Sequence, residues 1–140
     1  MKIDLLLEPF LPFMIRLIVG ILFLFQAYDK LLRVGLKETF EAIHETYKVY
    51  NIPKWFLKLS VTVSTYIELI AGSLLIIGLF KPIALLLLGI NLIMVTVSFS
   101  FHKGIWNMQN VFPRLLLLIA LFLIPMEWDV WTMDYLLNLR

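Results

Sequence analysis

The chain has 140 residues, of which 61% are hydrophobic and 16% are charged. A soluble domain averages about 45–50% apolar and about 25% charged residues, so this composition indicates a one-domain membrane protein. The net charge of +2 is too small to indicate nucleic-acid binding, the lack of cysteine excludes disulfides and thiolate metal sites within the chain, and two histidines leave little room for haem or metal.

Four apolar runs predict helices that cross a bilayer. A helix of about 20 residues spans ~30 Å, the thickness of the hydrocarbon core. The predicted spans are residues 10–32, 56–80, 82–101 and 111–126. Pro9 and Pro12 stand at the start of the first span, where a helix tolerates proline. Short connections between the spans predict an all-α, four-helix up-down bundle within the membrane.

The segment from Gly35 to Lys54 differs from the spans, because it mixes charged with apolar residues. Its apolar residues recur at i, i+4, i+7 and i+11, which are Leu36, Phe40, Ile43 and Tyr47. This spacing predicts a short amphipathic helix with one apolar face. We expect that helix to lie at the membrane interface or to fold over the end of the bundle.

A single acidic residue, Glu68, stands near the middle of the second span. A carboxylate at membrane depth costs roughly 2.5 kcal/mol or more, so it requires a partner or a role. Ser60, Ser64, Glu68 and Gly72 are spaced by four residues and therefore share one helix face. We expect this polar face to turn inward and the apolar faces to contact lipid.

The polar residues of the spans gather at one end of the predicted bundle. We call the end that holds both termini end A, and the opposite end end B. The pattern predicts a polar cavity that opens at end B, reaches Glu68 and is covered by the segment 35–54. Its candidate residues, with Arg16 from end A as a further hydrogen-bond or proton-transfer partner, are Arg16, Gln26, Lys30, Ser64, Glu68, Asn91, Ser98 and His102.

Each candidate also has a plainer interpretation. Serines and Asn91 often do no more than hydrogen-bond between helices. Lys30 can belong to a solvated rim, His102 can be an interfacial side chain, and Arg16 can be a snorkelling anchor. Glu68 is the hardest to explain without a role, because its depth leaves only pairing or protonation.

Two stretches resemble motifs of the DoxX family of small membrane proteins. Residues 16–31, RLIVGILFLFQAYDKL, are similar to its opening motif, and residues 68–94, ELIAGSLLIIGLFKPIALLLLGINLIM, to its second. His102 matches a family histidine, and Asp134 with Leu137 resembles a closing aspartate motif, so the resemblance covers nearly the whole chain. Pro113-Arg114 departs from the family pattern.

The resemblance implies a four-helix protein of the bacterial cytoplasmic membrane, but the fold transfers better than the activity. Some members resemble subunits of thiosulfate:quinone oxidoreductase or associate with redox enzymes, and distant relatives act in receptor assembly and cargo export. Three functions therefore stay open: a quinone-linked or redox-accessory subunit, a non-catalytic scaffold for a partner protein, and a small transporter. We expect contact with the lipid bilayer, and a protein partner or a homo-oligomer.

The basic residues are divided unevenly between the two predicted ends. End B carries eight of the 12 lysines and arginines and end A carries four. Because basic residues near span ends favour the cytoplasm, this asymmetry predicts that end B is cytoplasmic.

Overall fold

A computed structural model of the chain describes residues 4–102 and 111–138, all in helices and connecting turns without a strand. The longer helices are α1 (Asp4–Tyr28), α2 (Leu36–Tyr47), α3 (Lys54–Ile77), α4 (Lys81–His102) and α6 (Phe112–Leu123). The shorter ones are the π-helix η1 (Asp29–Arg33), the 3-10 helices η2 (Lys48–Tyr50) and η3 (Met126–Trp128), and α7 (Met133–Leu136). The predicted all-α class is confirmed for these residues.

Three helical segments are apolar and long enough to cross a membrane, which makes the chain an integral membrane protein. They are Leu7–Arg33 with 27 residues, Lys54–Ile77 with 24 and Lys81–Ser98 with 18. The fourth apolar helix, α6, has only 12 residues. At a rise of ~1.5 Å per residue it is about 18 Å long, which is less than the hydrocarbon thickness.

Two helix ends differ from the predicted span limits. The first helix begins at Asp4, so Pro9 and Pro12 lie inside it and not at its start. The residues that follow Asp4, three leucines and Glu8, are good helix formers, and they extend the helix to positions before the prolines. The second span ends at Ile77 and not at residue 80, because Gly78 adopts a left-handed conformation with φ 75° and caps the helix.

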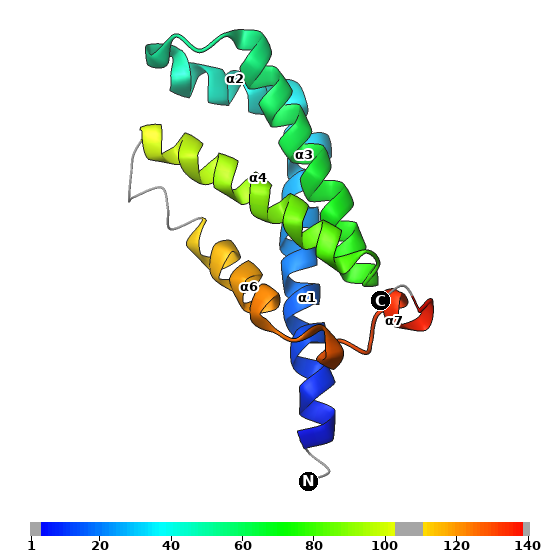
Figure 1. Ribbon diagram of the computed structural model, residues 1–140. Coiled ribbons are helices and arrows are strands. Elements are labelled where there is room, and N and C mark those ends of the chain that lie inside the picture. The colour runs from blue at the N-terminus through cyan, green and yellow to red at the C-terminus, as the bar shows by residue number, and fades with distance from the viewer. Residues whose placement is uncertain (1–3, 103–110, 139–140) are drawn as a thin grey trace.

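The long helices α1 and α3 form the most extensive helix pair and run in opposite directions (Figure 1). Their backbones meet at two glycines. A Cβ atom added at Gly72 would lie 3.0 Å from the carbonyl oxygen of Gly20 and 3.1 Å from the nitrogen of Leu24. Helices approach this closely in membranes when small residues stand at the crossing.

The other helices pack around this pair. In Figure 1 the helix α4 lies against α3, α6 lies beside α1 and α4, and α2 crosses the end where α1 stops. The C-terminal segment from η3 to α7 lies beside the turn between α3 and α4. The apolar core is formed by buried residues that include Val19, Phe23, Leu75, Leu88 and Leu118.

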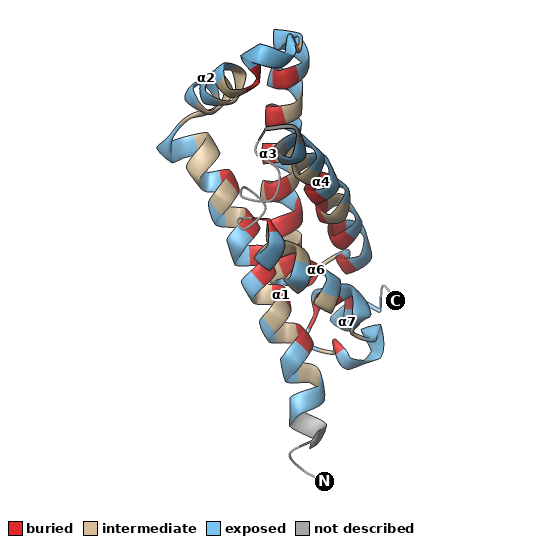
Figure 2. Ribbon diagram, turned by 90° about the vertical axis from the view of Figure 1, so that its left-hand side faces the viewer, coloured by how far each residue is buried: buried red, intermediate tan, exposed pale blue. Residues whose placement is uncertain are grey.

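The outer faces of the same helices remain apolar. Figure 2 shows buried residues on the inward faces and exposed residues outside. Large hydrophobic side chains such as Ile70, Leu86, Ile93 and Leu116 are each more than half exposed. A soluble protein rarely leaves so much apolar surface uncovered, whereas lipid chains cover it in a membrane.

Candidate functional site

Glu68 lies in the interior of the described helices and is paired with a cation. Its side chain is 1% exposed, and the Lys30 ammonium donates hydrogen bonds to its two carboxylate oxygens at 3.0 and 2.7 Å. A buried carboxylate is strongly destabilising unless such a pair and further hydrogen bonds satisfy it. Pairing therefore accounts for a carboxylate at this depth.

Two neutral side chains complete the surroundings of the same carboxylate. Asn91 donates its amide hydrogen to Glu68 Oε1 at 3.3 Å, and the Ser64 hydroxyl donates to that oxygen at 3.4 Å. We call Lys30, Ser64, Glu68 and Asn91 the Glu68 cluster. It joins residues from η1, α3 and α4, three elements that are separate in the sequence.

Lys30 leaves the first span from a widened helical turn. In a regular α-helix the Val34 amide would donate to the carbonyl of Lys30. Here it donates to the carbonyl of Asp29 at 2.8 Å, which makes the turn from Asp29 to Arg33 a π-helix. Single π-turns within helices frequently occur at functional sites. The sequence pattern, which assumes regular spacing, contains no signal for it.

Gln26 and Ser98 stand near the Glu68 cluster in sequence, but neither hydrogen-bonds to Glu68 in the part of the chain that the structure describes. Gln26 is one turn before Lys30, and its side-chain oxygen is buried with no hydrogen-bond partner in residues 4–102 and 111–138. Ser98 is exposed and its hydroxyl donates to Met94 of its own helix at 3.0 Å. His102 ends α4, and its side chain lies outside the described residues.

A tyrosine connects α2 to α4 close to Ser98. The Tyr47 hydroxyl donates to the Ser98 carbonyl at 2.6 Å. Burial, and secondarily the neighbouring Tyr50, raises the pKa of Tyr47 above its usual value, so the hydroxyl remains a donor at neutral pH. On α2, the four positions expected to form an apolar face, Leu36, Phe40, Ile43 and Tyr47, are buried or half-buried.

Arg16 does not join the Glu68 cluster, which corrects its assignment to the cavity. It stands 14 residues before Lys30 on the same helical segment, about 21 Å away at ~1.5 Å per residue. Its guanidinium donates to the Trp131 carbonyl at 2.6 Å, and another of its nitrogens lies 3.7 Å from Asp129 Oδ1. The side chain is 1% exposed, so it does not snorkel to the surface either.

Asp129 joins Arg16 to a second buried cation. The Lys81 ammonium lies 2.7 Å from Asp129 Oδ2, and all three side chains are buried. We call Arg16, Lys81 and Asp129 the Arg16 cluster. The pattern of the sequence did not identify Asp129, because it lies in a turn without periodicity. Arg16 and Lys81 are both predicted at end A, and buried cations require an acid nearby. This requirement is the signal that could have identified Asp129.

Asp134 performs a different task in the same region. Its two carboxylate oxygens accept hydrogen bonds from the backbone amides of Phe80 at 2.8 Å and Lys81 at 3.0 Å. The backbone amide of Asp134 donates in turn to the Gly78 carbonyl at 3.0 Å. An acidic side chain thus caps the first turn of α4 from a segment 53 residues later in the chain.

Among the surface hollows in the described part of the chain are two that Glu68 does not line. One, with a volume of about 300 Å³, lies beside the Arg16 cluster and is lined by residues that include Lys81, Asp129 and Asp134. The other, of about 690 Å³, lies between α2 and the start of α3. A cavity that reaches Glu68 therefore stays a prediction. Within the described residues, no three His, Asp or Glu side chains gather as metal ligands.

Comparison with known proteins gives a family. No curated protein and no solved structure matches the chain. The DoxX family model matches residues 11–103, a range that contains the whole Glu68 cluster and Arg16. The match ends before α6, so it is shorter than the expected resemblance, and Asp129 and Asp134 lie beyond it. Because the match covers more than half of the 140 residues, the chain belongs to the DoxX family.

Proposed function

We propose that this chain is a quinone-linked membrane subunit of a redox complex, and that the Glu68 cluster binds the quinone headgroup. The observation that carries the proposal is the Lys30–Glu68 ion pair at membrane depth. Glu68 is 1% exposed whereas Lys30 is 22% exposed, so the pair is accessible from the lysine side. An ionisable side chain within a membrane span, with its partner named, points to a functional site.

The residues present fit the chemistry of such a headgroup. Its carbonyl oxygens accept hydrogen bonds, and Lys30 and Asn91, which both donate to Glu68 Oε1, are side chains with further N–H groups to donate. The buried oxygen of Gln26 offers an acceptor for the hydroxyl group of the reduced form. A bound quinone would supply two-electron chemistry with proton uptake. Glu68 would hold a proton at its carboxylate, and Lys30 would balance the charge when that proton leaves.

The architecture in this proposal is the four-helix bundle that the sequence predicts. α6 serves as a short fourth span, α2 lies at the membrane interface, and the cavity opens at end B beneath α2. The helix directions and the apolar outer faces support this arrangement. In this proposal the protein resides in the bacterial cytoplasmic membrane, and a partner protein delivers the electrons.

The experiment is mass spectrometry of the molecules that co-purify with the chain in mild detergent. The wild type is compared with Glu68→Gln, which keeps the shape of the side chain but removes its charge. Glu127→Gln, at an exposed acid outside the cluster, is the matched control. The proposal requires a quinone that is retained by the wild type and the control and is lost from Glu68→Gln.

A second function, a non-catalytic scaffold for a partner protein, has its own support. Both oxygens of Glu68 are engaged within the chain, and together they connect three elements. Such a network can serve helix packing alone. A partner protein held equally by the wild type and Glu68→Gln, without any quinone, would favour this function. Substrate flux in liposomes would instead favour a small transporter.

A further inference from the structure

The hollow between α2 and the start of α3 has no role in the proposed quinone site. Its volume is about 690 Å³, and its walls come from the second half of α2 and the turn that leads into α3. We call it the α2 hollow. The residues that matter for its chemistry are Phe40, Glu41, His44, Glu45, Lys48 and Lys54.

The α2 hollow carries both signs of charge around an aromatic wall. Glu41 and Glu45 stand one turn apart on α2, and Lys48 and Lys54 follow them. The rings of Phe40 and His44, which lie 5.8 Å apart, line the same hollow. Lys48 lies 3.5 Å from Glu45, and both side chains are about two-thirds exposed. An exposed pair of this kind is weak, so both groups can turn to a ligand.

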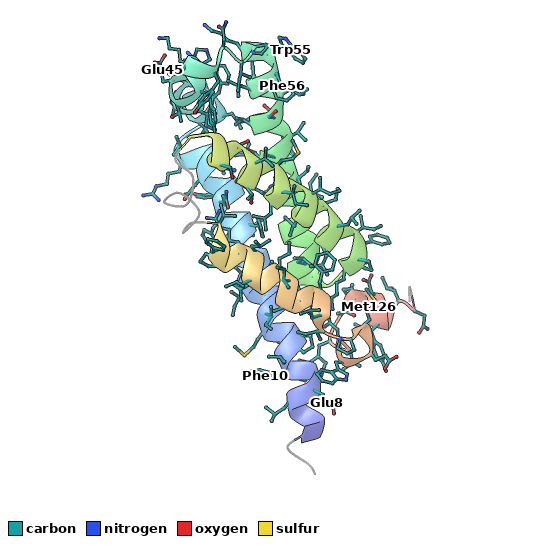
Figure 3. The ribbon with its side chains drawn as sticks, turned by 60° about the vertical axis from the view of Figure 1, so that its left-hand side comes forward. Glu8, Phe10, Glu45, Trp55, Phe56 and Met126 are labelled. Carbon is teal, nitrogen blue, oxygen red and sulfur yellow. The ribbon has the colours of Figure 1, made fainter. Side chains whose placement is uncertain are left out.

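The same hollow adjoins the membrane boundary. α3, a spanning helix, begins at Lys54, which is a wall of the hollow. Val49 is 89% exposed and Trp55 is 70% exposed, and Trp55 packs edge-on against Phe56. Figure 3 shows Trp55 and Phe56 projecting outward at the same end of the molecule as Glu45. Exposed tryptophan beside lysines at the start of a span is typical of the headgroup region.

We infer that the α2 hollow binds a phospholipid headgroup that carries a primary ammonium beside its phosphate, as phosphatidylethanolamine does. The carboxylates of Glu41 and Glu45 accept hydrogen bonds from the ammonium, and Lys48 and Lys54 pair with the phosphate. The inference rests on the interfacial placement of α2 under the proposed function, and it is independent of the quinone site.

The charges of the hollow distinguish this headgroup from two others. A phosphatidylglycerol headgroup is anionic without a cation, so it would leave the two carboxylates opposite hydroxyl groups. A phosphatidylcholine headgroup has a cation without N–H donors, so it could not donate to Glu41 or Glu45. A primary ammonium supplies three donors in a compact volume.

The test is native mass spectrometry of the full chain reconstituted in vesicles with equal parts of the three phospholipids. We expect phosphatidylethanolamine to be retained over phosphatidylcholine by about tenfold, the ratio that one charge-assisted hydrogen bond corresponds to. The double variant Glu41→Gln, Glu45→Gln should lose this preference. The control Glu38→Gln, Glu127→Gln removes two exposed acids outside the hollow and should keep it.

A second readout separates the placement of α2 from the choice of headgroup. The chain has no cysteine, so Val49→Cys can carry a single fluorescent label, and lipids with a quencher at headgroup depth report its position. Quenching of the label with equal retention of all three lipids would overturn the inference and keep the placement. A label that only aqueous quenchers reach would overturn both, whereas quinone retention is unaffected by either result.

Discussion

Two buried acidic side chains of this molecule are paired with cations in different arrangements. In the Glu68 cluster one acid receives one partly exposed cation and two neutral donors. In the Arg16 cluster one acid, Asp129, lies between two buried cations and no side chain of the three reaches solvent. The second arrangement is less tolerant, because loss of the acid removes the ion-pair partner of two buried cations at once.

Asp129→Asn should therefore destabilise the protein strongly. Removing one partner of a buried ion pair costs roughly 3–5 kcal/mol, because the remaining charge stays buried. The matched control is Asp29→Asn, since Asp29 pairs with Arg33 at 3.7 Å but both side chains are largely exposed. That pair contributes about 0.3–0.5 kcal/mol at most. The fraction of folded protein after heating in detergent measures both, and equal losses would contradict the role of Asp129.

At the residue scale, regular helical spacing accounts for part of the arrangement around Glu68. Ser64 and Glu68 share a face by their spacing of four, and the Ser64 hydroxyl donates to the carboxylate that Lys30 also contacts. The choice of Lys30 as the cation depended on which helices are neighbours, which spacing does not encode. Asp129 was missed and Arg16 was misplaced for the same reason, because their contact joins distant segments.

At the scale of elements, the crossing of α1 and α3 sets the framework for both clusters. Glycine at positions 20 and 72 lets the two backbones touch, and the clusters lie on either side of this contact. The predicted polar stripe on the second span included Gly72. The spacing alone did not show whether this small residue lets two helices pack closely or lines a cavity. The close contact with Gly20 shows that packing is its task here.

Gly72→Ala should weaken the helix pair. The added Cβ would lie 3.0 Å from a backbone oxygen, so α1 and α3 must move apart, and overpacking of this kind costs about 1–3 kcal/mol. Gly89→Ala is the control, because its Cβ would meet only side-chain atoms at 3.8 and 3.9 Å, an ordinary contact. Thermal unfolding, followed by circular dichroism in detergent, compares the two variants. A Gly72→Ala variant as stable as the wild type would show that α1 and α3 accommodate the added Cβ.

The cap of α4 gives a second prediction at this scale. Asp134→Ala removes both acceptors from the first turn of α4, and loss of an N-terminal cap costs about 0.5–2 kcal/mol. Asp134→Asn keeps one acceptor oxygen and should recover part of this loss. Hydrogen exchange at the amides of Phe80 and Lys81 is the measurement, and unchanged protection in the alanine variant would exclude the capping role.

At the scale of the whole molecule, composition and hydropathy were sufficient for the class of fold. The long apolar runs fixed three spans, because their length matches the bilayer. The fourth run was correctly placed in the chain but forms a helix of only 12 residues, which no periodicity reveals. The position of the C-terminal segment against the turn before α4 also lay beyond the sequence, since it depends on long-range pairing.

The orientation of the molecule in the membrane is open to a direct test. The excess of basic residues predicts that end B faces the cytoplasm. In intact cells, a membrane-impermeant maleimide should label Glu127→Cys, in η3 at end A, and should leave Lys37→Cys, in α2 at end B, unlabelled. Permeabilised cells should label both. The reverse pattern in intact cells would invert the assignment.

The Arg16 cluster has a consequence for biogenesis. The ribosome completes the Trp131 partner of Arg16 only after another 115 residues, and at ~5–20 residues per second this takes roughly 6–23 seconds. Until then Arg16, and Lys81 once it has been made, lack the acid Asp129 that pairs with both in the folded protein. Without Asp129, both cations would stay unpaired with this acid, which is costly in the protein interior.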